Sequence, residues 1–515
     1  MSPVLLIHAP GARICEPFSS VGRLAGELGA NGVDVAVWDA SLDLTLELLK
    51  SEDVPGSIEG QGSGRPRRDP VAHSITLLRQ KRGYASFDRY QNAVGKLEER
   101  LLQKTGGVHS LADFRDDRYP PLTIHGLERS AREWKNNALA PLFGPVLDDY
   151  IEGRGCSTVG FSLSYLSQAG MAFAMAGYIR ERHPQVKCVM GGGLVISFTS
   201  LPDWSNHWPW LWDGIHGGSA FQWLRVFHEL EPAPQTLGSH DYQELLPWRY
   251  LSPGPVIPVS ASSGCWWKGC TFCPERYEDM PYLQAPPAKT VQVLHELTRR
   301  YDPVLFHITD NEVSPALCAA LMADPPGVSW YGFSRFFPKL ADREFCVELA
   351  NSGCVMLQLG LESAHQGVLD HLNKGISLSL VVKALENLRH AGIGVYLYLL
   401  FGTPVETRES ALVTRDFCVA HAHEIDFYNL ALFNLPVESP AARELPSRGN
   451  YDAELSLYMD FEHPLGWHRG QIRPFLDQEF RGHPALRPAI LRNPPVFTSN
   501  HAPFFLHMVG KPTPL

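Results

Sequence analysis

Three cysteines lie close together in the segment Gly264-Cys265-Trp-Trp-Lys-Gly-Cys270-Thr-Phe-Cys273. Thiolates are the ligands that soft metal centres prefer. Three of them can hold three irons of a four-iron cluster and leave the fourth iron open to an external ligand. An open iron suits catalysis, because a substrate or cofactor can bind the metal directly. The triplet therefore predicts a [4Fe–4S] cluster held by Cys265, Cys270 and Cys273.

Two alternatives remain for these cysteines. One is a zinc site completed by a histidine, although structural zinc sites usually show paired C-x-x-C elements and the sequence has no second pair. The other is a set of unconnected core thiols. The remaining cysteines in apolar patterns are expected in the core: Cys188, Cys318, Cys346, Cys354 and Cys418.

The triplet follows the first strand of an alternating strand–helix series. Apolar runs typical of buried strands lie at 256–261, 304–309, 329–334, 354–359, 394–400 and 426–432. Helical patterns separate them at 288–301, 315–322, 341–352, 378–391 and 407–421. Six such units predict a parallel, barrel-like sheet whose chemistry lies at the carboxyl ends of its strands.

A second α/β pattern occupies the amino-terminal part of the chain. Strand patterns lie at 4–8, 33–38, 158–164 and 186–190, with helical patterns at 19–29 and 171–182. They predict a parallel, Rossmann-like sheet. An insertion at 51–150 interrupts it, opening with a Gly- and Arg-rich stretch at 60–68 that is typical of a solvated linker. The rest of the insertion is expected to be helical.

The overall composition is that of a globular protein. The chain has 515 residues, 44% hydrophobic and 19% charged, enough for about three domains. Its net charge of −10 argues against a nucleic-acid partner. The uncharged stretch 160–179 contains serines and glycines that favour strand, loop and helix over a membrane span. Ten cysteines are too few for a disulfide scaffold and no secretory signal pattern opens the chain, so we expect a cytoplasmic protein.

The segment from about 255 to 435 resembles the radical SAM superfamily, whose partial (β/α)6 barrel carries a cysteine triplet after its first strand. The family spacing is C-x3-C-x2-C. Here four residues separate Cys265 and Cys270, one more than usual, whereas the Cys270-Thr-Phe-Cys273 half is intact. The resemblance implies that S-adenosyl-L-methionine (SAM) binds the open iron. It also implies that reductive cleavage of SAM gives a 5′-deoxyadenosyl radical, which abstracts hydrogen from an unactivated C–H bond.

The resemblance also implies which residues contact SAM. After the second strand, the methionine amino group would be contacted by Asp310, Asn311 and Glu312. After the fourth strand, the ribose or methionine moiety would be contacted by Glu362 and Ser363, and after the fifth strand the adenine would be contacted by Gly402, Thr403 and Pro404. Phe272, between two of the cysteines, would contact the nucleoside. Each alone is typical of a helix cap or a turn; their order after the cysteine loop indicates the site.

Residues 1–50 and 155–235 resemble the cobalamin-binding domain that precedes the barrel in one radical SAM subgroup. Small residues after its third and fourth strands would let the cobalamin nucleotide tail approach the backbone; they are Ser162, Ser164, Gly191, Gly192 and Gly193. The Asp-x-His-x-x-Gly motif is absent after the first strand. This implies cobalamin bound without histidine ligation, and His8 more simply makes a local hydrogen bond. A scaffold that binds no cobalamin is the alternative.

We therefore expect three parts: a cobalamin-binding-type domain at 1–235, a radical SAM barrel at 236–445 and an α-rich capping segment at 446–515. The resemblance implies a cobalamin-dependent radical SAM enzyme that methylates an unactivated carbon of a peptide or small natural-product intermediate. The alternatives are a radical SAM rearrangement, cyclisation or epimerisation, and a non-enzymatic iron–sulfur sensor. An electron donor such as flavodoxin or ferredoxin is expected. Four aromatic residues either line a substrate pocket or belong to the core: Trp266, Trp267, Tyr396 and Tyr398. Three histidines of the carboxy-terminal segment are either general bases or ordinary surface residues: His463, His468 and His483.

Overall fold

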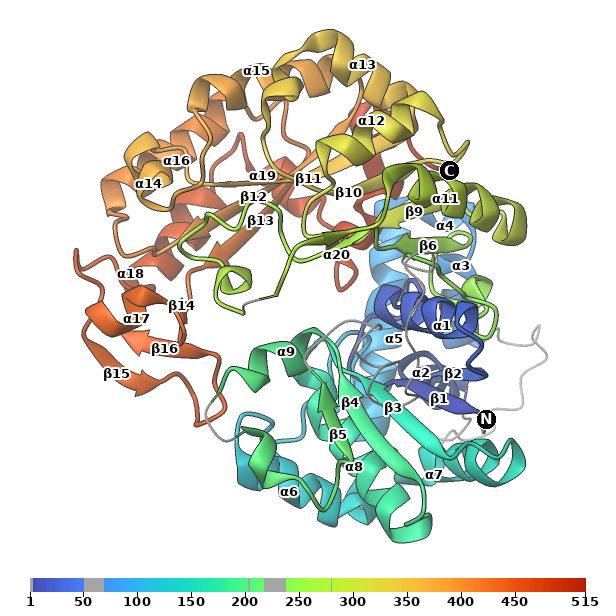
Figure 1. Cartoon of the computed structure of the whole chain (residues 1–515). Helices are drawn as coiled ribbons and strands as arrows, with labels where there is room; N and C mark the ends of the chain where they lie inside the picture. Colours follow the sequence, from blue (N-terminus) through green and yellow to red (C-terminus); the bar gives the residue numbers. More distant parts are fainter. Residues whose placement is uncertain (1–2, 51–68, 202–203, 217–237, 279) are drawn as a thin grey trace, which may run out of the picture.

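Two parallel sheets form the framework of the protein (Figure 1). The computed structural model describes residues 3–50, 69–201, 204–216, 238–278 and 280–515. The Gly- and Arg-rich stretch at 60–68 lies outside these ranges. Among the described residues, no helix combines the length and the apolar character that crossing a membrane would require.

The first sheet has the strand order β2-β1-β3-β4-β5, and all its pairs are parallel. Helix α1 (Ser19–Ala30) packs with Val4 and Leu6 of β1 on one face. Helix α8 (Leu166–Arg182) packs with Leu5 and Ile7 on the other. Residues of both faces are buried, which is why the strands read as continuous apolar runs. The strands are β1 (Val4–His8), β2 (Val35–Asp39), β3 (Thr158–Ser162), β4 (Lys187–Gly191) and β5 (Gly214–His216).

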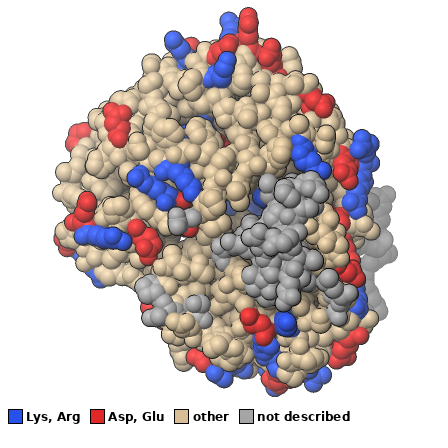
Figure 2. All heavy atoms as spheres, viewed as in Figure 1, with Lys and Arg blue, Asp and Glu red and all other residues tan. Residues whose placement is uncertain are grey.

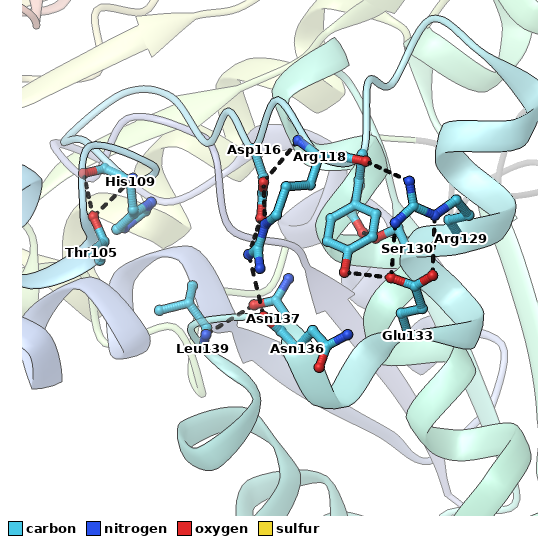
Figure 3. Close-up of polar contacts among 12 residues, drawn as sticks. Thr105, His109, Asp116, Arg118, Arg129, Ser130, Glu133, Asn136, Asn137 and Leu139 are labelled. Atoms are coloured by element: carbon cyan, nitrogen blue, oxygen red, sulfur yellow. Dashed lines mark hydrogen bonds and ion pairs between the residues drawn. The ribbon is translucent and has the colours of Figure 1, made fainter.

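The insertion is helical, as the sequence predicts. Its helices are α3 (Pro70–Leu78), α4 (Lys81–Tyr84), α5 (Phe87–Thr105), α6 (Ile124–Arg132) and α7 (Ala140–Asp148). The connection between α5 and α7 is held by polar contacts (Figure 3). Glu133 accepts hydrogen bonds from Arg129 at 3.1 Å and from the Tyr119 hydroxyl at 2.9 Å. The Ser130 hydroxyl donates to the Gly170 carbonyl at 2.7 Å, which fixes α6 on α8 and so ties the insertion to the first sheet.

The second sheet confirms the predicted barrel series. Its six strands follow chain order, β6-β9-β10-β11-β12-β13, and every pair is parallel. The strands are β6 (Val256–Val259), β9 (Leu305–Ile308), β10 (Trp330–Ser334), β11 (Cys354–Glu362), β12 (Gly394–Phe401) and β13 (Phe427–Leu432). The helices between them include α11 (Pro287–Tyr301), α12 (Pro315–Ala323), α13 (Arg343–Asn351), α14 (Gln366–His371), α15 (Leu378–His390) and α16 (Arg408–Ala420). The two sheets meet at α1, which contacts β1 and β2 on one side and β6 on the other.

The carboxy-terminal segment differs in part from the α-rich expectation. A three-stranded antiparallel sheet precedes its helices, formed by β14 (Leu435–Pro436), β15 (Ser447–Asn450) and β16 (Tyr458–Phe461). Such short strands contain too few residues to show the alternation of apolar and polar side chains that identifies a strand in a sequence. Further on, Phe497, Phe504 and Phe505 share one buried core with Tyr331 and Tyr396 of the barrel strands. The last residues of the chain therefore pack into the barrel sheet, and Tyr396 belongs to that core.

Charged side chains are interspersed on the face shown in Figure 2. Lysine and arginine alternate with aspartate and glutamate there, and the described residues of this face form no extended basic surface. This distribution agrees with the net charge of −10.

Candidate functional site

The cysteine loop starts at the carboxyl end of β6 and is anchored there by Asp310. One carboxylate oxygen of Asp310 accepts hydrogen bonds from the backbone N–H groups of Ala261 at 2.7 Å and Ser262 at 3.0 Å. The other oxygen, Oδ2, is buried without a hydrogen-bond partner among the described residues. Burial raises the pKa of Asp310 to about 6, although these hydrogen bonds act in the opposite direction. Asp310 thus positions the loop and keeps one oxygen available.

The three cysteines of the loop are free thiols in the structure. Among the described residues, the three sulfur atoms do not all lie within 4.8 Å of one another. Burial raises the pKa of Cys270, whereas the nearby Lys374 and Arg335 lower it. Burial raises the pKa of Cys273 to about 12. The thiols stand for the thiolates that would bind a cluster.

The turn Asn373-Lys374-Gly375 holds the cysteine loop in place. Trp267 Nε1 donates to the Asn373 carbonyl at 3.2 Å, and Asn373 Nδ2 donates to the Gly269 carbonyl at 2.8 Å. Gly375 has φ +69°, and a Cβ atom there would fall within 3.0 Å of the Trp267 ring. Position 375 therefore requires glycine for both conformation and space. This turn supports the loop that carries the additional residue.

Two buried cations that sequence reasoning missed lie beside Cys270. Arg335 follows β10, stacks on Trp267 at 4.2 Å, and its Nη1 lies 3.7 Å from the Cys270 sulfur. Lys374 Nζ donates to Glu362 Oε1 at 2.9 Å. Lys374 lies in the Asn373-Lys374-Gly375 segment, which resembles a recurring pattern of the superfamily, but neither it nor Arg335 was predicted to contact the cluster or SAM. The positive charges of these two buried side chains can balance the negative charges of cluster-binding thiolates and of a carboxylate on a bound ligand.

Glu312 is the predicted SAM residue best suited to receive a ligand. It is 3% exposed, and neither carboxylate oxygen has a hydrogen-bond partner among the described residues. Arg335 Nε lies 3.9 Å from Glu312 Oε2. Burial raises the pKa of Glu312 to about 7, opposed by the Arg335 and Lys374 charges. A buried carboxylate that lacks a hydrogen-bond partner and lies near a cation matches an amino-acid group, which carries one charge of each sign.

The other predicted SAM residues have different surroundings. Asn311 is exposed, and Ser363 is fully buried with its hydroxyl 3.2 Å from the Thr414 hydroxyl. Phe272, Leu400 and Phe461 pack against a small buried cluster that includes Phe433, near the ends of β12 and β13. This apolar group lies next to the turn at Gly402, Thr403 and Pro404.

That turn is fixed by two side chains. The backbone N–H of Gly402 donates to Glu406, and His463 Nε2 lies 2.8 Å from the Thr403 carbonyl. Burial raises the pKa of Glu406 to about 7. His463 thus has a structural contact, and it lies in the segment that follows the short antiparallel sheet.

A cavity of about 340 Å³ lies between the first sheet and the cysteine loop. All five predicted cobalamin residues line it: Ser162, Ser164, Gly191, Gly192 and Gly193. Its opposite wall includes Ser260, Ser263 and Met280, which flank the cysteines. A Cβ atom at Gly193 would meet nothing within 4 Å, and the Ser263 hydroxyl is buried without a partner among the described residues. A cavity with small residues on one wall and an unsatisfied hydroxyl on the other fits the polar tail of a large cofactor.

His8 is packed into the domain and does not reach this cavity's lining. Its ring stacks on Phe18 at 4.3 Å, and Gln168 Nε2 lies 3.2 Å from its Nδ1. Burial lowers the pKa of His8. His8 thus has a structural hydrogen-bonding partner, although it is 160 positions away and not local in sequence as expected.

Residues 259–418 match the model of the Radical SAM superfamily. This segment is a radical SAM domain. The whole chain is similar in fold to the radical SAM methyltransferase TsrM from Kitasatospora setae with tryptophan substrate and a SAM analog bound. That match has a TM-score of 0.56 and 14% identity and covers 95% of this chain and 89% of TsrM. The cobalamin-dependent radical enzyme OxsB gives a TM-score of 0.56 at 10% identity, covering 93% of this chain and 67% of OxsB.

Curated relatives match the radical SAM part of the chain over a shorter length. The anaerobic magnesium-protoporphyrin IX monomethyl ester cyclase of Rubrivivax gelatinosus is 25% identical over 170 residues, 32% of this chain and 30% of the cyclase. The bacteriochlorophyllide d C-12(1)-methyltransferase of Chlorobaculum tepidum is 26% identical over 184 residues, 34% of this chain and 40% of that enzyme. The chain thus aligns with less than half the length of these relatives, which include both a cyclase and a methyltransferase.

Proposed function

We propose that this protein is a cobalamin-dependent radical SAM enzyme that methylates an unactivated carbon of a peptide or small natural-product intermediate. One observation carries the proposal. The residues that flank the cysteine triplet and the small residues after β3 and β4 form opposite walls of a single cavity. A cofactor bound in that cavity would therefore adjoin the iron–sulfur site. The similarity in fold to TsrM and OxsB supports the same arrangement.

Each cofactor has a candidate set of residues. Cys265, Cys270 and Cys273 would hold the cluster. Glu312 and the cations Arg335 and Lys374 would bind the amino-acid part of SAM, and Phe272 with the turn 402–404 would hold its nucleoside. Ser162, Ser164 and residues 191–193 would receive the cobalamin tail. Together these groups supply radical hydrogen abstraction and a transferable methyl group.

The protein's own contribution is to orient the cofactors and exclude water. Phe272, Leu400 and Phe433 form an apolar wall at the barrel mouth. Arg335 and Lys374 are 8% and 6% exposed, so their charges act in a poorly solvated environment. A low-potential donor such as flavodoxin or ferredoxin and a cytoplasmic location form part of this proposal.

The first experiment is anaerobic reconstitution with iron, sulfide and hydroxocobalamin, followed by desalting and metal analysis. We expect about four irons and one cobalt per chain, the stoichiometry of one cluster and one corrinoid. Iron without cobalt would contradict the cobalamin assignment. Cys270→Ala should abolish 5′-deoxyadenosine formation from SAM, whereas Cys318→Ala, a substitution in the core, should not.

Product mass separates methylation from the second candidate, a radical cyclisation or rearrangement. The cyclases among the relatives favour that candidate. Methylation requires 5′-deoxyadenosine together with a product that has gained one methyl group. A product without that gain in mass would instead support cyclisation or rearrangement.

A further inference from the structure

Arg23 brings a positive charge to the wall of the cavity that the predicted cobalamin residues line. It lies on α1, and its side chain is 13% exposed. Among the described residues of that wall, no other is lysine or arginine and none is aspartate or glutamate. Burial lowers the pKa of His216, which also lines the cavity, so this imidazole is uncharged near neutral pH. The charge of the wall therefore favours an anionic ligand.

Two contacts fix the Arg23 guanidinium. Its Nε donates to Glu27 Oε1 at 2.8 Å, one turn further along α1, and its Nη1 donates to Ser260 Oγ at 3.4 Å. Glu27 is 1% exposed, accepts a second hydrogen bond from the backbone N–H of Gly238 at 2.9 Å, and is not among the residues that line the cavity. A guanidinium has five N–H donors. Within the described part of the chain these contacts use two of them, so the group is held in place with donors left for a ligand.

Neutral hydrogen-bond donors face the same cavity. The Ser20 and Ser162 hydroxyls lie 2.9 Å apart, and both residues line it. The Ser263 hydroxyl on the opposite wall is buried without a partner among the described residues. Helix α1 begins at this cavity, and its first turn has no acidic side chain and no side-chain cap. Since the first N–H groups of a helix lack intrahelical acceptors and carry the positive end of its dipole, they favour an anion as well.

A corrinoid with a complete nucleotide tail carries one phosphodiester in that tail. This group has a negative charge and several acceptor oxygens, whereas the amide side chains of the corrin ring are neutral. Arginine binds phosphate through planar, charge-assisted N–H donors. Ser162 and residues 191–193, the small residues expected beside the tail, line the cavity together with Arg23. A tail that lies along these residues would bring its phosphate into the cavity that contains the guanidinium.

We propose that Arg23 and the start of α1 bind the phosphodiester of the cobalamin tail. Arg23 is thereby a specificity-determining residue, because the protein selects corrinoids that carry the phosphate over corrinoids that lack it. Glu27 and Ser260 are positioning residues that fix the guanidinium. The inference rests on the proposed function, since it takes this cavity as the place where cobalamin binds.

The test compares cobinamide phosphate with cobinamide, two corrinoids that differ only in the phosphate group. Binding to the full-length, cluster-loaded protein is measured from the corrinoid absorbance spectrum, without turnover. We expect the wild type to bind cobinamide phosphate about tenfold or more tightly, the effect of one charge-assisted hydrogen bond. Arg23→Gln should remove most of this preference and leave the affinity for cobinamide unchanged. Arg154→Gln is the matched control, because Arg154 also pairs with a glutamate, Glu244, but is not among the residues that line the cavity.

Arg23→Gln leaves the buried Glu27 carboxylate without its cation, so the double variant Arg23→Gln/Glu27→Gln is measured beside it. A normal iron content and unfolding temperature identify the folded variants. Equal affinities of the two corrinoids for the wild-type protein would overturn the inference, as would a preference that survives in both variants.

Failure of the proposed function would give a different result. Hydroxocobalamin itself would not be retained after desalting, and the Arg23 assignment would fall with the cobalamin site. Retained hydroxocobalamin together with equal affinities for the two probes would overturn the Arg23 assignment alone.

Discussion

The Trp267 side chain packs directly against Gly375, so closely that a Cβ atom at position 375 would fall within 3.0 Å of the indole ring. Trp267 belongs to the part of the cysteine loop that is one residue longer than the family spacing. Its contact with Gly375, together with the Trp267–Asn373 hydrogen bond, fixes that part of the loop before any cluster binds. The longer loop is therefore supported by the protein itself.

Gly375→Ala should lower the amount of iron retained after reconstitution. The substitution places a methyl group against Trp267 and also imposes a left-handed conformation on alanine, which costs about 1–2 kcal/mol. Iron and sulfide analysis after desalting measures the effect. Gly327→Ala is the matched control, because Gly327 has φ +74° but nothing within 4 Å of its Cβ position. Equal iron contents in the two variants would show that the Trp267 contact is unimportant.

Lys374→Met should destabilise the cluster-free protein by about 3 kcal/mol, since it leaves the Glu362 carboxylate largely buried without its cation. Adding Glu362→Gln should recover most of this loss, because no unpaired charge remains. Thermal unfolding of the two variants measures the difference.

An exposed ion pair provides the control for that prediction. Lys135 lies 2.5 Å from Glu181, with side chains 64% and 48% exposed. Lys135→Met should change stability by less than about 1 kcal/mol. If Lys374→Met proved no more harmful than Lys135→Met, the buried pair would not have the structural role assigned to it.

The framework of the site could be predicted from the sequence, but several of its contacts could not. The apolar run at 394–400 becomes β12 (Gly394–Phe401), because a continuous apolar segment of that length suits a strand buried on both faces. Cys270 and Cys273 were found because their ligand chemistry depends on local spacing. Glu16 and His307 contact each other although they are 291 positions apart, and no spacing in the sequence indicates this pair. Only the packing of α1 against β6 brings such residues together.

Gly193→Leu should weaken cobalamin retention about tenfold or more, because the added side chain would occupy the cavity at a cost of about 1–3 kcal/mol. Iron content should stay unchanged, since Gly193 belongs to the cavity wall opposite the cysteine loop. Cobalt and iron analysis of the same desalted sample measures both. Gly95→Leu, at an open exposed position of α5, is the control. Full cobalt retention in Gly193→Leu would contradict the assignment of this cavity.

Glu406 should make the protein less stable as the pH rises from about 5 to 8. Its pKa is raised from the ordinary 4.5 to about 7 by burial. Between these values the unfolded chain has released a proton that the folded chain still holds, so rising pH favours unfolding, by roughly 3 kcal/mol in total.

Glu406→Gln removes this titration while keeping an oxygen that can accept hydrogen bonds from Gly402 N–H and Trp467 Nε1. Unfolding temperatures of the cluster-free wild type and variant should therefore be similar near pH 5, with the variant more stable at pH 8. Because the other titrating carboxyls are present in both proteins, their contributions cancel in the comparison. Glu409→Gln, an exposed change in the first turn of α16, three residues after Glu406, should follow the wild type. Parallel curves for wild type and Glu406→Gln would mean that Glu406 is ionised in the folded protein across this range.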